Sequence, residues 1–265
     1  MTRVTAVGSA DAFNSAGRGH TAWLLEDGQG ALMVDFGATA LQGLRRLGRD
    51  PLALDAVLFT HLHGDHIGGW PFLLVDAQYR AQRTRALTVC GPPGTRDRLQ
   101  ALWSACYADT STKPLGFPLE VRELRPGDAL ELQGRRVEAH AAQHMRPPHV
   151  ALSYRVGEIA FTGDTGAHDG LRALTQGARL LCCECTDLRR GPVRAGPGFP
   201  AGQTRHLSWE ELRTLLPALG VGRVLLAHLS EEARAGAAAI EAEARALGLD
   251  VHVCDDGSGS SLGGC

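Results

Sequence analysis

The chain has 265 residues, a formal net charge of -2 and an aromatic content of 5%. That length suits one α/β domain of the larger kind with a substantial core, and the charge balance argues against an obligate nucleic-acid-binding protein. The sequence has no run of 18 apolar residues, so no membrane span is expected. Residues 1–8 lack the apolar centre of a signal peptide.

Short apolar runs near residues 4–7, 22–25 and 31–35 predict the first three strands. Asp27-Gly28 is a hairpin-turn sequence between the second run and the third. Asp35 ends the third strand, a position where an aspartate often caps a helix or stabilises a turn. The chain therefore begins with a region that favours β-hairpin pairing.

The next predicted strand, residues 56–59, runs directly into Thr60-His61-Leu62-His63-Gly64-Asp65-His66. Four metal-binding side chains thus fall within six consecutive residues: His61, His63, Asp65 and His66. A loop at a strand end lets them converge on a cation without burying unpaired backbone, and histidine with aspartate suits zinc or a similar metal. The spacing differs from the i, i+4 helical pair of the zincins. A histidine-rich polar turn is the alternative, but chance rarely gives so dense a cluster.

Four further polar side chains lie where a predicted strand or loop ends, and each alone would usually be structural. Three of them follow the apolar strands predicted near residues 137–140, 158–161 and 224–227. The other lies just ahead of a helix that opens with the Ser208–Glu211 capping-box pattern. In chain order, the four residues are His144, Asp164, His206 and His228.

Seven cysteines are present, and Cys182, Cys183 and Cys185 crowd one strand-like run. Neighbours on one strand are poor disulfide partners, so free thiols in a reducing cytoplasm are expected. A cysteine metal site is the alternative. Since no second C-x-x-C pair stands near this run and the run is otherwise apolar, buried cysteine is the better interpretation.

Two segments are rich in small residues. Residues 189–205 are rich in Gly and Pro and contain several arginines, which fit an anion-binding loop beside the site and fit a solvated surface equally well. Residues 255–265 are rich in Gly and Ser, so a C-terminal tail with little function is expected there.

The segment 61–66 is similar to the H-x-H-x-D-H motif of the metallo-β-lactamase superfamily. His144, Gly163-Asp164-Thr165 and His228 resemble the later metal motifs of that family, in the same order. The resemblance extends along nearly the whole chain. It implies an α/β fold with a single domain over residues 1–265, in which two facing β-sheets are covered by helices to give four αββα layers.

The same resemblance implies two divalent metal ions, expected to be zinc, with manganese and iron as alternatives. One ion would be held by His61, His63 and His144. The other would be held by Asp65, His66 and His228. Asp164 would bridge the two ions, because each carboxylate oxygen can bind a different one. Asp35 would support the metal loop by hydrogen bonding and is not counted as a ligand.

Two further features resemble the ribonuclease Z-like branch of the superfamily. Glu184-Cys185-Thr186 is similar to the E-A-T element of that branch. Arg205-His206-Leu207-Ser208 is similar to its G-H-S/T element, although the glycine is missing. The glutamate and the histidine cooperate in catalysis in that branch, which implies catalytic roles for Glu184 and His206. Members of the branch commonly form dimers, so a homodimer is expected.

Bacterial tRNA-processing members of that branch carry a long arm that grips tRNA, inserted between the third metal histidine and the bridging aspartate. Here only residues 145–163 fill this interval, and they read as a plain strand pair. Contacts with phosphate groups dominate tRNA binding, and a protein with a net charge of -2 does not attract phosphates overall. tRNA is therefore not the expected substrate.

The hypothesis drawn from these features is a two-metal phosphodiesterase that acts on a small phosphodiester such as a cyclic nucleotide. Hydroxide bound by the metals would attack phosphorus. Asp65 would orient this hydroxide in addition to binding a metal ion. His206, held by Glu184, would protonate the leaving oxygen. A lactone, thioester or sulfate ester hydrolase with the same site is the alternative. An RNA-processing nuclease, an iron-containing redox protein and a non-catalytic metal-binding protein rank lower.

Overall fold

The computed structural model of the chain describes residues 1–190 and 204–263. The strands are β1 Thr2–Gly8, β2 Ala22–Asp27, β3 Gly30–Val34, β4 Leu54–Leu58, β5 Leu87–Gly91, β6 Leu119–Glu123, β7 Ala129–Leu132, β8 Arg135–Ala142, β9 Ala151–Val156, β10 Ile159–Phe161, β11 Leu180–Glu184, β12 Arg223–Ala227, β13 Val251–Val253 and β14 Gly259–Leu262. The α-helices are α1 Ala40–Arg46, α2 Gly64–Ile67, α3 Trp70–Val75, α4 Thr95–Cys106, α5 Gly170–Thr175, α6 Trp209–Leu219, α7 Glu231–Ala235 and α8 Ala237–Ala246. The remaining helical turns are η1 Ser15–Gly17, η2 Pro51–Ala53 and the π-helical η3 Asp76–Arg80.

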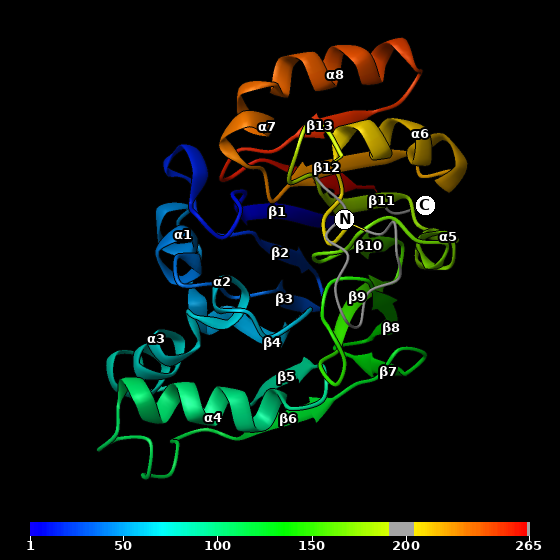
Figure 1. Cartoon of the computed structure of the whole chain (residues 1–265). Coiled ribbons are helices and arrows are strands. Elements are labelled where there is room, and N and C mark those ends of the chain that lie inside the picture. Colours follow the sequence, from blue (N-terminus) through cyan, green and yellow to red (C-terminus); the bar gives the residue numbers. More distant parts are fainter. Residues whose placement is uncertain (191–203, 264–265) are drawn as a thin grey trace.

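Two sheets, each of seven strands within the described residues, form the centre of the fold (Figure 1). The first sheet has the order β14-β1-β2-β3-β4-β5-β6, and the second has the order β13-β12-β11-β10-β9-β8-β7. Helices α1 to α4 pack on the outer face of the first sheet, and α5 to α8 pack on that of the second. The predicted α/β fold with four αββα layers in a single domain is confirmed.

Side-chain alternation along the central strands builds an apolar core on each face of each sheet. In β4, Leu58 belongs to the core between the sheets, whereas Val57 packs with the helices of the first half. In β11, Cys182 joins the inter-sheet core and Cys183 joins the core beneath α5 to α8. Because both faces of these strands are buried, their sequences read as continuous apolar runs.

The cysteines of β11 and its end are free and buried, as predicted: Cys182, Cys183 and Cys185. Burial raises the pKa of each of these thiols, since a buried thiolate loses its hydration. They therefore act as small apolar residues that fill the core on both sides of the strand.

The C-terminal segment is not the tail that its composition predicted. Gly259–Leu262 forms β14, which pairs antiparallel with β1 at the edge of the first sheet. A Cβ atom on Gly259 would lie 2.3 Å from the carbonyl oxygen of Val4. The glycine thus permits a close approach between the two strands. Glycine suggested a loop in the sequence, but here the strand pairing requires it.

Strands from both sheets end at one edge of the sandwich, and their ends carry the polar residues that the sequence singled out. The carboxyl ends of parallel strands share an edge, and β10, β11 and β12 are parallel neighbours. The residues that follow or end β4, β8, β10, β11 and β12 are, in that order, 60–66, His144, Asp164, Glu184 and His228. Folding therefore gathers side chains that lie far apart in the sequence.

Between His144 and Asp164 the chain forms a loop followed by the antiparallel pair β9–β10. The described residues 145–163 thus contain the predicted strand pair and no inserted arm. In the part of the chain that the structure describes, no helix is both long enough and apolar enough to cross a membrane.

Candidate metal centre

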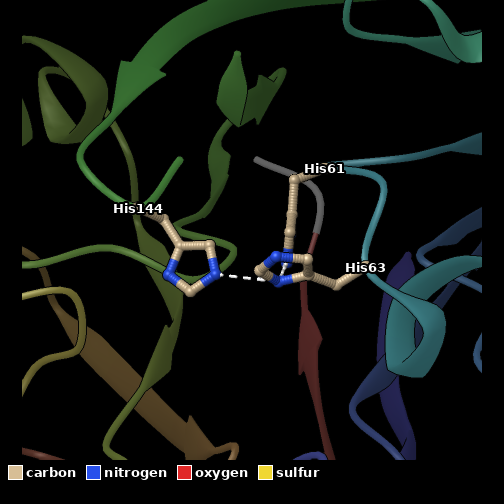
Figure 2. Close-up of side chains that lie close together, drawn as sticks. All are labelled: His61, His63 and His144. Carbon is tan, nitrogen blue, oxygen red and sulfur yellow. Dashed lines mark hydrogen bonds between the residues drawn. The ribbon is translucent and has the colours of Figure 1, made fainter. Parts of the chain in front are cut away.

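Three histidines from two segments turn their ring nitrogens toward one another (Figure 2). His61 and His63 lie on the loop between β4 and α2, and His144 follows β8. The Nδ1 atom of His63 is 3.0 Å from His61 Nε2 and 3.1 Å from His144 Nε2. One proton can satisfy only one pair of these nitrogens, whereas a metal ion could accept a lone pair from all three. We call these residues the first group.

Two of these histidines are anchored through their other nitrogen. His61 Nδ1 lies 3.1 Å from the Thr60 hydroxyl, which donates its own proton to Asp35, so His61 Nδ1 is the donor. His144 Nδ1 donates to the carbonyl oxygen of Arg205 at 3.1 Å. Each anchor selects the tautomer whose Nε2 lone pair is available to a metal.

A second group lies beside the first and consists of Asp65, His66, Asp164 and His228. His66 Nε2 is 3.2 Å from Asp65 Oδ2 and 3.4 Å from Asp164 Oδ2. His228 Nε2 is 3.7 Å and 3.4 Å from the same two oxygens. One potential ligand atom from each of the four residues lies within 4.8 Å of the others.

The histidines of the second group are anchored by carboxylates, directly or through a hydroxyl. His66 Nδ1 donates to Asp35 Oδ2 at 2.8 Å, which is the contact expected of a residue that supports the metal loop. His228 Nδ1 is 2.9 Å from the Thr186 hydroxyl, which donates to Glu184. Asp35 and His228 have φ angles of 63° and 58°. Backbone strain of this kind in non-glycine residues concentrates at functional sites.

Asp164, a member of the second group, also faces the first group. Its Oδ2 atom is 3.4 Å from one pair of imidazole Nε2 atoms and 3.8 Å from another pair. The nearer pair belongs to His66 and His228, and the farther pair to His61 and His144. Gly163 has a φ of 57°, and a Cβ there would lie 2.7 Å from Thr60 Cβ. The glycine therefore lets the turn after β10 bring the carboxylate close to donors of both groups.

The chemistry of the donor set fits divalent cations. The Nε2 atoms of His66 and His228 are buried and have no partner with hydrogen-bond geometry among the described residues. Unpaired buried nitrogens cost free energy unless something else supplies their partner. Imidazole and carboxylate donors in this combination suit zinc, and also manganese and iron. Each group could hold one such ion.

The two groups differ in how readily their histidines take up a proton. Burial lowers the pKa of His144 to about 4 and lowers the pKa values of the other two histidines of the first group. Burial also opposes charge on His66 and His228, but Asp164 and the nearby carboxylates outweigh it and raise both pKa values. Without metal, the first group therefore favours neutral histidines and the second favours protonated ones.

Glu184 and His206 form a hydrogen-bonded pair beside the second group. His206 Nδ1 lies 3.1 Å from Glu184 Oε2, and its ring stacks on His228 with centroids 5.3 Å apart. Burial disfavours the charged ring, but the Glu184 carboxylate outweighs it and raises the pKa of His206 to about 9. The side chain is 30% exposed. The pair could thus present a protonated imidazole to a bound molecule.

The position of His206 is set by the helix that follows it. The predicted capping box is present, with Ser208 accepting from the Glu211 backbone and Glu211 accepting from Ser208 at the start of α6. A nitrogen of His206 also lies close enough to ligand atoms of His144 and Asp164 to complete a metal site. The geometry therefore allows a ligand role as well as an acid role for His206.

A cavity of about 840 Å³ opens onto the centre. Its wall contains most of the residues that the sequence predicted, namely His63, Asp65, His144, Asp164, His206 and His228. It also contains residues that the sequence did not single out, including Asp11, Phe13 and Arg146. All predicted ligands are thus brought together, and a molecule in the cavity would contact both groups.

Residues 191–203 of the predicted arginine-rich loop 189–205 lie outside the described residues. Its last residue, Arg205, lines the cavity. The anion-binding role of the loop therefore stays a prediction.

Several supporting residues were missed by sequence reasoning. Thr60 and Thr186 anchor metal-centre histidines, and the hydroxyl directly before His61 was a signal that could have indicated the first of them. His20 is only 9% exposed, and its Nδ1 atom has no partner among the described residues. Burial lowers the pKa of His20, although the charge of Asp65 opposes this. Nothing around His20 in the sequence indicates that it lies near the centre.

Comparison with known proteins agrees with this architecture. Residues 32–229 match the family model described as the beta-lactamase superfamily domain. The chain belongs to this superfamily. It is 25% identical to ribonuclease Z of Methanothermobacter thermautotrophicus, over 97% of this chain and 95% of the relative.

Solved structures give the same picture for this superfamily member. The metallo-β-lactamase fold protein YhfI from Bacillus subtilis has a TM-score of 0.77 and 22% identity, with 98% of both chains covered. A diphosphatase from the PhnP family has a TM-score of 0.76 and 15% identity, with 100% and 99% covered. The protein is a metal-dependent hydrolase of the ribonuclease Z-like branch of the metallo-β-lactamase superfamily.

Proposed function

We propose that this hydrolase uses two divalent ions, expected to be zinc, to cleave a small phosphodiester such as a cyclic nucleotide. The observation that carries the proposal is the Glu184–His206 pair, which lies beside both ligand groups with His206 in the cavity wall. Cleavage of a phosphodiester needs an acid for the departing oxygen, and His206 is suited to supply it. The names of two similar proteins, a ribonuclease and a diphosphatase, also favour chemistry at phosphorus.

The ligand assignment is part of this proposal. One ion would be held by His61, His63 and His144. The other would be held by Asp65, His66 and His228, with Asp164 between the two. Bound there, the ions would supply Lewis-acid activation of water and of the phosphoryl oxygens. The anchored imidazole rings and the 3.4 to 3.8 Å distances around Asp164 Oδ2 support this arrangement.

Three residues would have tasks in catalysis. Asp65 would orient the attacking water, because its carboxylate lines the cavity and stays charged. Burial works against that charge, but the neighbouring imidazoles of His228 and His66 lower the pKa of Asp65. His206 would give a proton from Nε2 to the leaving oxygen, since Nδ1 is engaged by Glu184. Glu184 would hold that ring in place and keep it protonated.

The cavity favours a small substrate over tRNA. Its volume of about 840 Å³ falls in the range of small-molecule sites. Arg146 and Arg205 lie in its wall, and guanidinium groups suit phosphate. The plain strand pair between His144 and Asp164 offers no arm to grip a folded RNA.

Hydrolysis of a lactone, thioester or sulfate ester is the second candidate. The same ions would polarise a carbonyl or sulfuryl oxygen equally well. Ala12 and Phe13 in the cavity wall supply apolar surface that an acyl chain could contact. The Glu184–His206 pair favours the phosphodiester, because an acid for the leaving group matters more there than in hydrolysis of a thioester.

The first experiment measures turnover of bis(p-nitrophenyl) phosphate, a cyclic nucleotide, a lactone and a thioester by protein of known metal content. We expect phosphodiester turnover with two ions per chain. His206→Ala should retain both ions and lower turnover of a cyclic nucleotide, whose departing alkoxide oxygen needs a proton, by about 10²- to 10⁴-fold. Turnover of bis(p-nitrophenyl) phosphate should fall less, because p-nitrophenolate is a stable leaving group. His252→Ala is the matched control, because His252 lies on β13 with its side chain 50% exposed and outside the cavity wall.

Two outcomes would contradict the proposal in different ways. Turnover of the lactone or thioester alone would shift the assignment to a carbonyl-ester hydrolase. Loss of an ion in His206→Ala would make His206 a ligand, which the geometry permits.

A cytoplasmic homodimer is the remaining part of the proposal. The cysteines of the described chain are free, and five of these six are buried, which suits a reducing compartment. The dimer rests on the resemblance to the ribonuclease Z-like branch. Light scattering after size-exclusion chromatography tests it, and a monomer at micromolar concentration would contradict it.

A further inference from the structure

Phe13 differs from the other exposed large apolar side chains in its location. It is 87% exposed and lies in the wall of the cavity that contains His63, Asp65 and His206. The other such residues of the described chain are outside that wall: Met1, Phe72, Tyr79 and Leu247. A single exposed apolar residue needs no explanation, but an aromatic ring in the wall of a catalytic cavity is a candidate substrate contact.

The loop that carries Phe13 is held by its own acidic residue. We call residues 9–19 the Phe13 loop; it joins β1 to the residues before β2 and contains η1. The Oδ1 atom of Asp11, which is 4% exposed, accepts from the backbone N–H groups of Phe13 and Ser15 at 3.1 and 3.3 Å. Asp11 therefore fixes the backbone on both sides of the ring-bearing residue.

The backbone beyond Phe13 is strained and is held from outside the loop. Asn14 and Ala16 both have φ angles of 55°, and alanine rarely adopts such a conformation. The N–H group of Ala16 donates to Glu231 Oε2 of α7 at 2.6 Å. A strained conformation persists only where its surroundings determine it. The contact with Glu231 therefore indicates that the loop has one fixed backbone conformation.

The two ends of the Phe13 loop are clamped by one carboxylate. Asp256 Oδ1 accepts from the N–H and hydroxyl groups of Ser9 at 3.0 and 2.9 Å, and Asp256 Oδ2 accepts from the N–H of Gly19 at 2.9 Å. The loop thus fixes the backbone that carries an exposed aromatic side chain. A ligand that stacks on the ring would need to order that side chain alone and not the loop, which limits the conformational entropy lost in the protein.

We propose that Phe13 is the platform on which the nucleobase of a nucleotide stacks while its phosphate lies at the metal centre. The face of a phenylalanine ring offers a stacking surface to any planar base. Arg146 and Arg205 line the same cavity, where guanidinium groups suit the phosphate. This inference rests on the proposed function and names its substrate class as nucleoside phosphodiesters.

Calorimetric titration of the full-length, metal-loaded protein with AMP and with ribose 5-phosphate tests this inference, because the two ligands differ only in the base. We expect AMP to bind about tenfold more tightly. Phe13→Ala should bring this ratio close to one by weakening AMP alone, and Phe13→Trp should keep it. Phe72→Ala removes an exposed phenylalanine outside the cavity and should change neither dissociation constant.

A ratio near one in the unaltered protein, or a ratio that Phe13→Ala leaves unchanged, would overturn the inference. Equal weakening of both ligands in Phe13→Ala would also overturn it, since it would indicate a disturbed loop and not a lost stacking contact. Failure of the proposed function looks different. A protein that prefers AMP through Phe13 but turns over no phosphodiester would contradict the phosphodiesterase and leave the stacking platform intact.

Discussion

The two ligand groups of the metal centre contain similar side chains but have different surroundings. In the first group, His61 is anchored through the Thr60 hydroxyl by Asp35, and His144 is anchored by the backbone carbonyl of Arg205. In the second group, His66 is anchored directly by Asp35, and His228 is anchored through Thr186 by Glu184. Two further carboxylates, Asp65 and Asp164, belong to the second group itself.

This difference shows that the side-chain type of a ligand does not fix how readily it takes up a proton. The carboxylates give the second group a negative charge that attracts a divalent cation, but the same charge attracts protons to its histidines. The first group has less negative charge, so its histidines hold protons less tightly and a metal ion that binds there meets less competition from protons. Asp164 links the two groups, because its Oδ2 atom is within 3.8 Å of nitrogens from both.

Removing that link should have the largest effect. In Asp164→Ala we expect the loss of at least one ion per chain, because the second group loses a ligand and the first loses its nearest carboxylate. Turnover should fall on the order of a thousandfold, since metal activation is worth several powers of ten. Elemental analysis and kcat measure the two effects. Full retention of both ions would contradict the bridging assignment.

Weakening the anchor of the second group should have an intermediate effect. Asp35 accepts from Thr60 and His66, and Asp35→Asn would place an amide donor against these donors. We expect metal affinity to fall by about 10- to 100-fold, with the larger loss at the second group, because Asp35 contacts His66 directly and reaches His61 of the first group only through Thr60. Competition with a chromogenic chelator measures both affinities.

The matched control for Asp35→Asn is Asp55→Asn. Asp55 lies on β4 of the same sheet, is 8% exposed, accepts from the backbone of Ala31 and pairs with Arg85. Its substitution should lower the free energy of unfolding without changing metal affinity. Equal losses of metal affinity in both variants would mean that general destabilisation, and not the anchor, explains the effect.

The ligands differ in how far the sequence revealed them. Those in 61–66 are contiguous, so their chemistry is visible before the fold is known. His144, Asp164 and His228 are single residues at strand ends, and their meaning came from resemblance to a family. Phe13 carried no signal, since an aromatic residue in a loop becomes notable only when the fold places it in the cavity wall.

The fold was predicted best where side-chain pattern and tertiary environment agree. The apolar runs of β4 and β11 indicated strands because both of their faces are buried. The expectation that the C-terminal Gly/Ser segment is a tail was wrong. Composition indicates only how flexible a segment is by itself, whereas this segment is ordered by pairing with the free edge of β1. The clamp formed by Asp256 was missed for the same reason.

The pH dependence of metal binding should separate the two groups. In the metal-free protein, Asp164 and its neighbours raise the pKa values of His66 and His228, so an ion entering the second group must displace protons. Its affinity should therefore fall as the pH falls, by about tenfold per pH unit for each proton displaced. Burial lowers the pKa of His144 to about 4, so the first group should change little between about pH 8 and pH 6.

Two variants separate the groups, because His63→Ala removes a ligand of the first and His228→Ala removes a ligand of the second. Calorimetry in buffers of different ionisation enthalpy counts the protons released as each variant binds its remaining ion. We expect more protons from His63→Ala, which retains the carboxylate-rich second group, than from His228→Ala. Equal release would mean that the carboxylates around His66 do not hold a proton there in the metal-free protein. The contrast between the two groups would then lie in geometry alone.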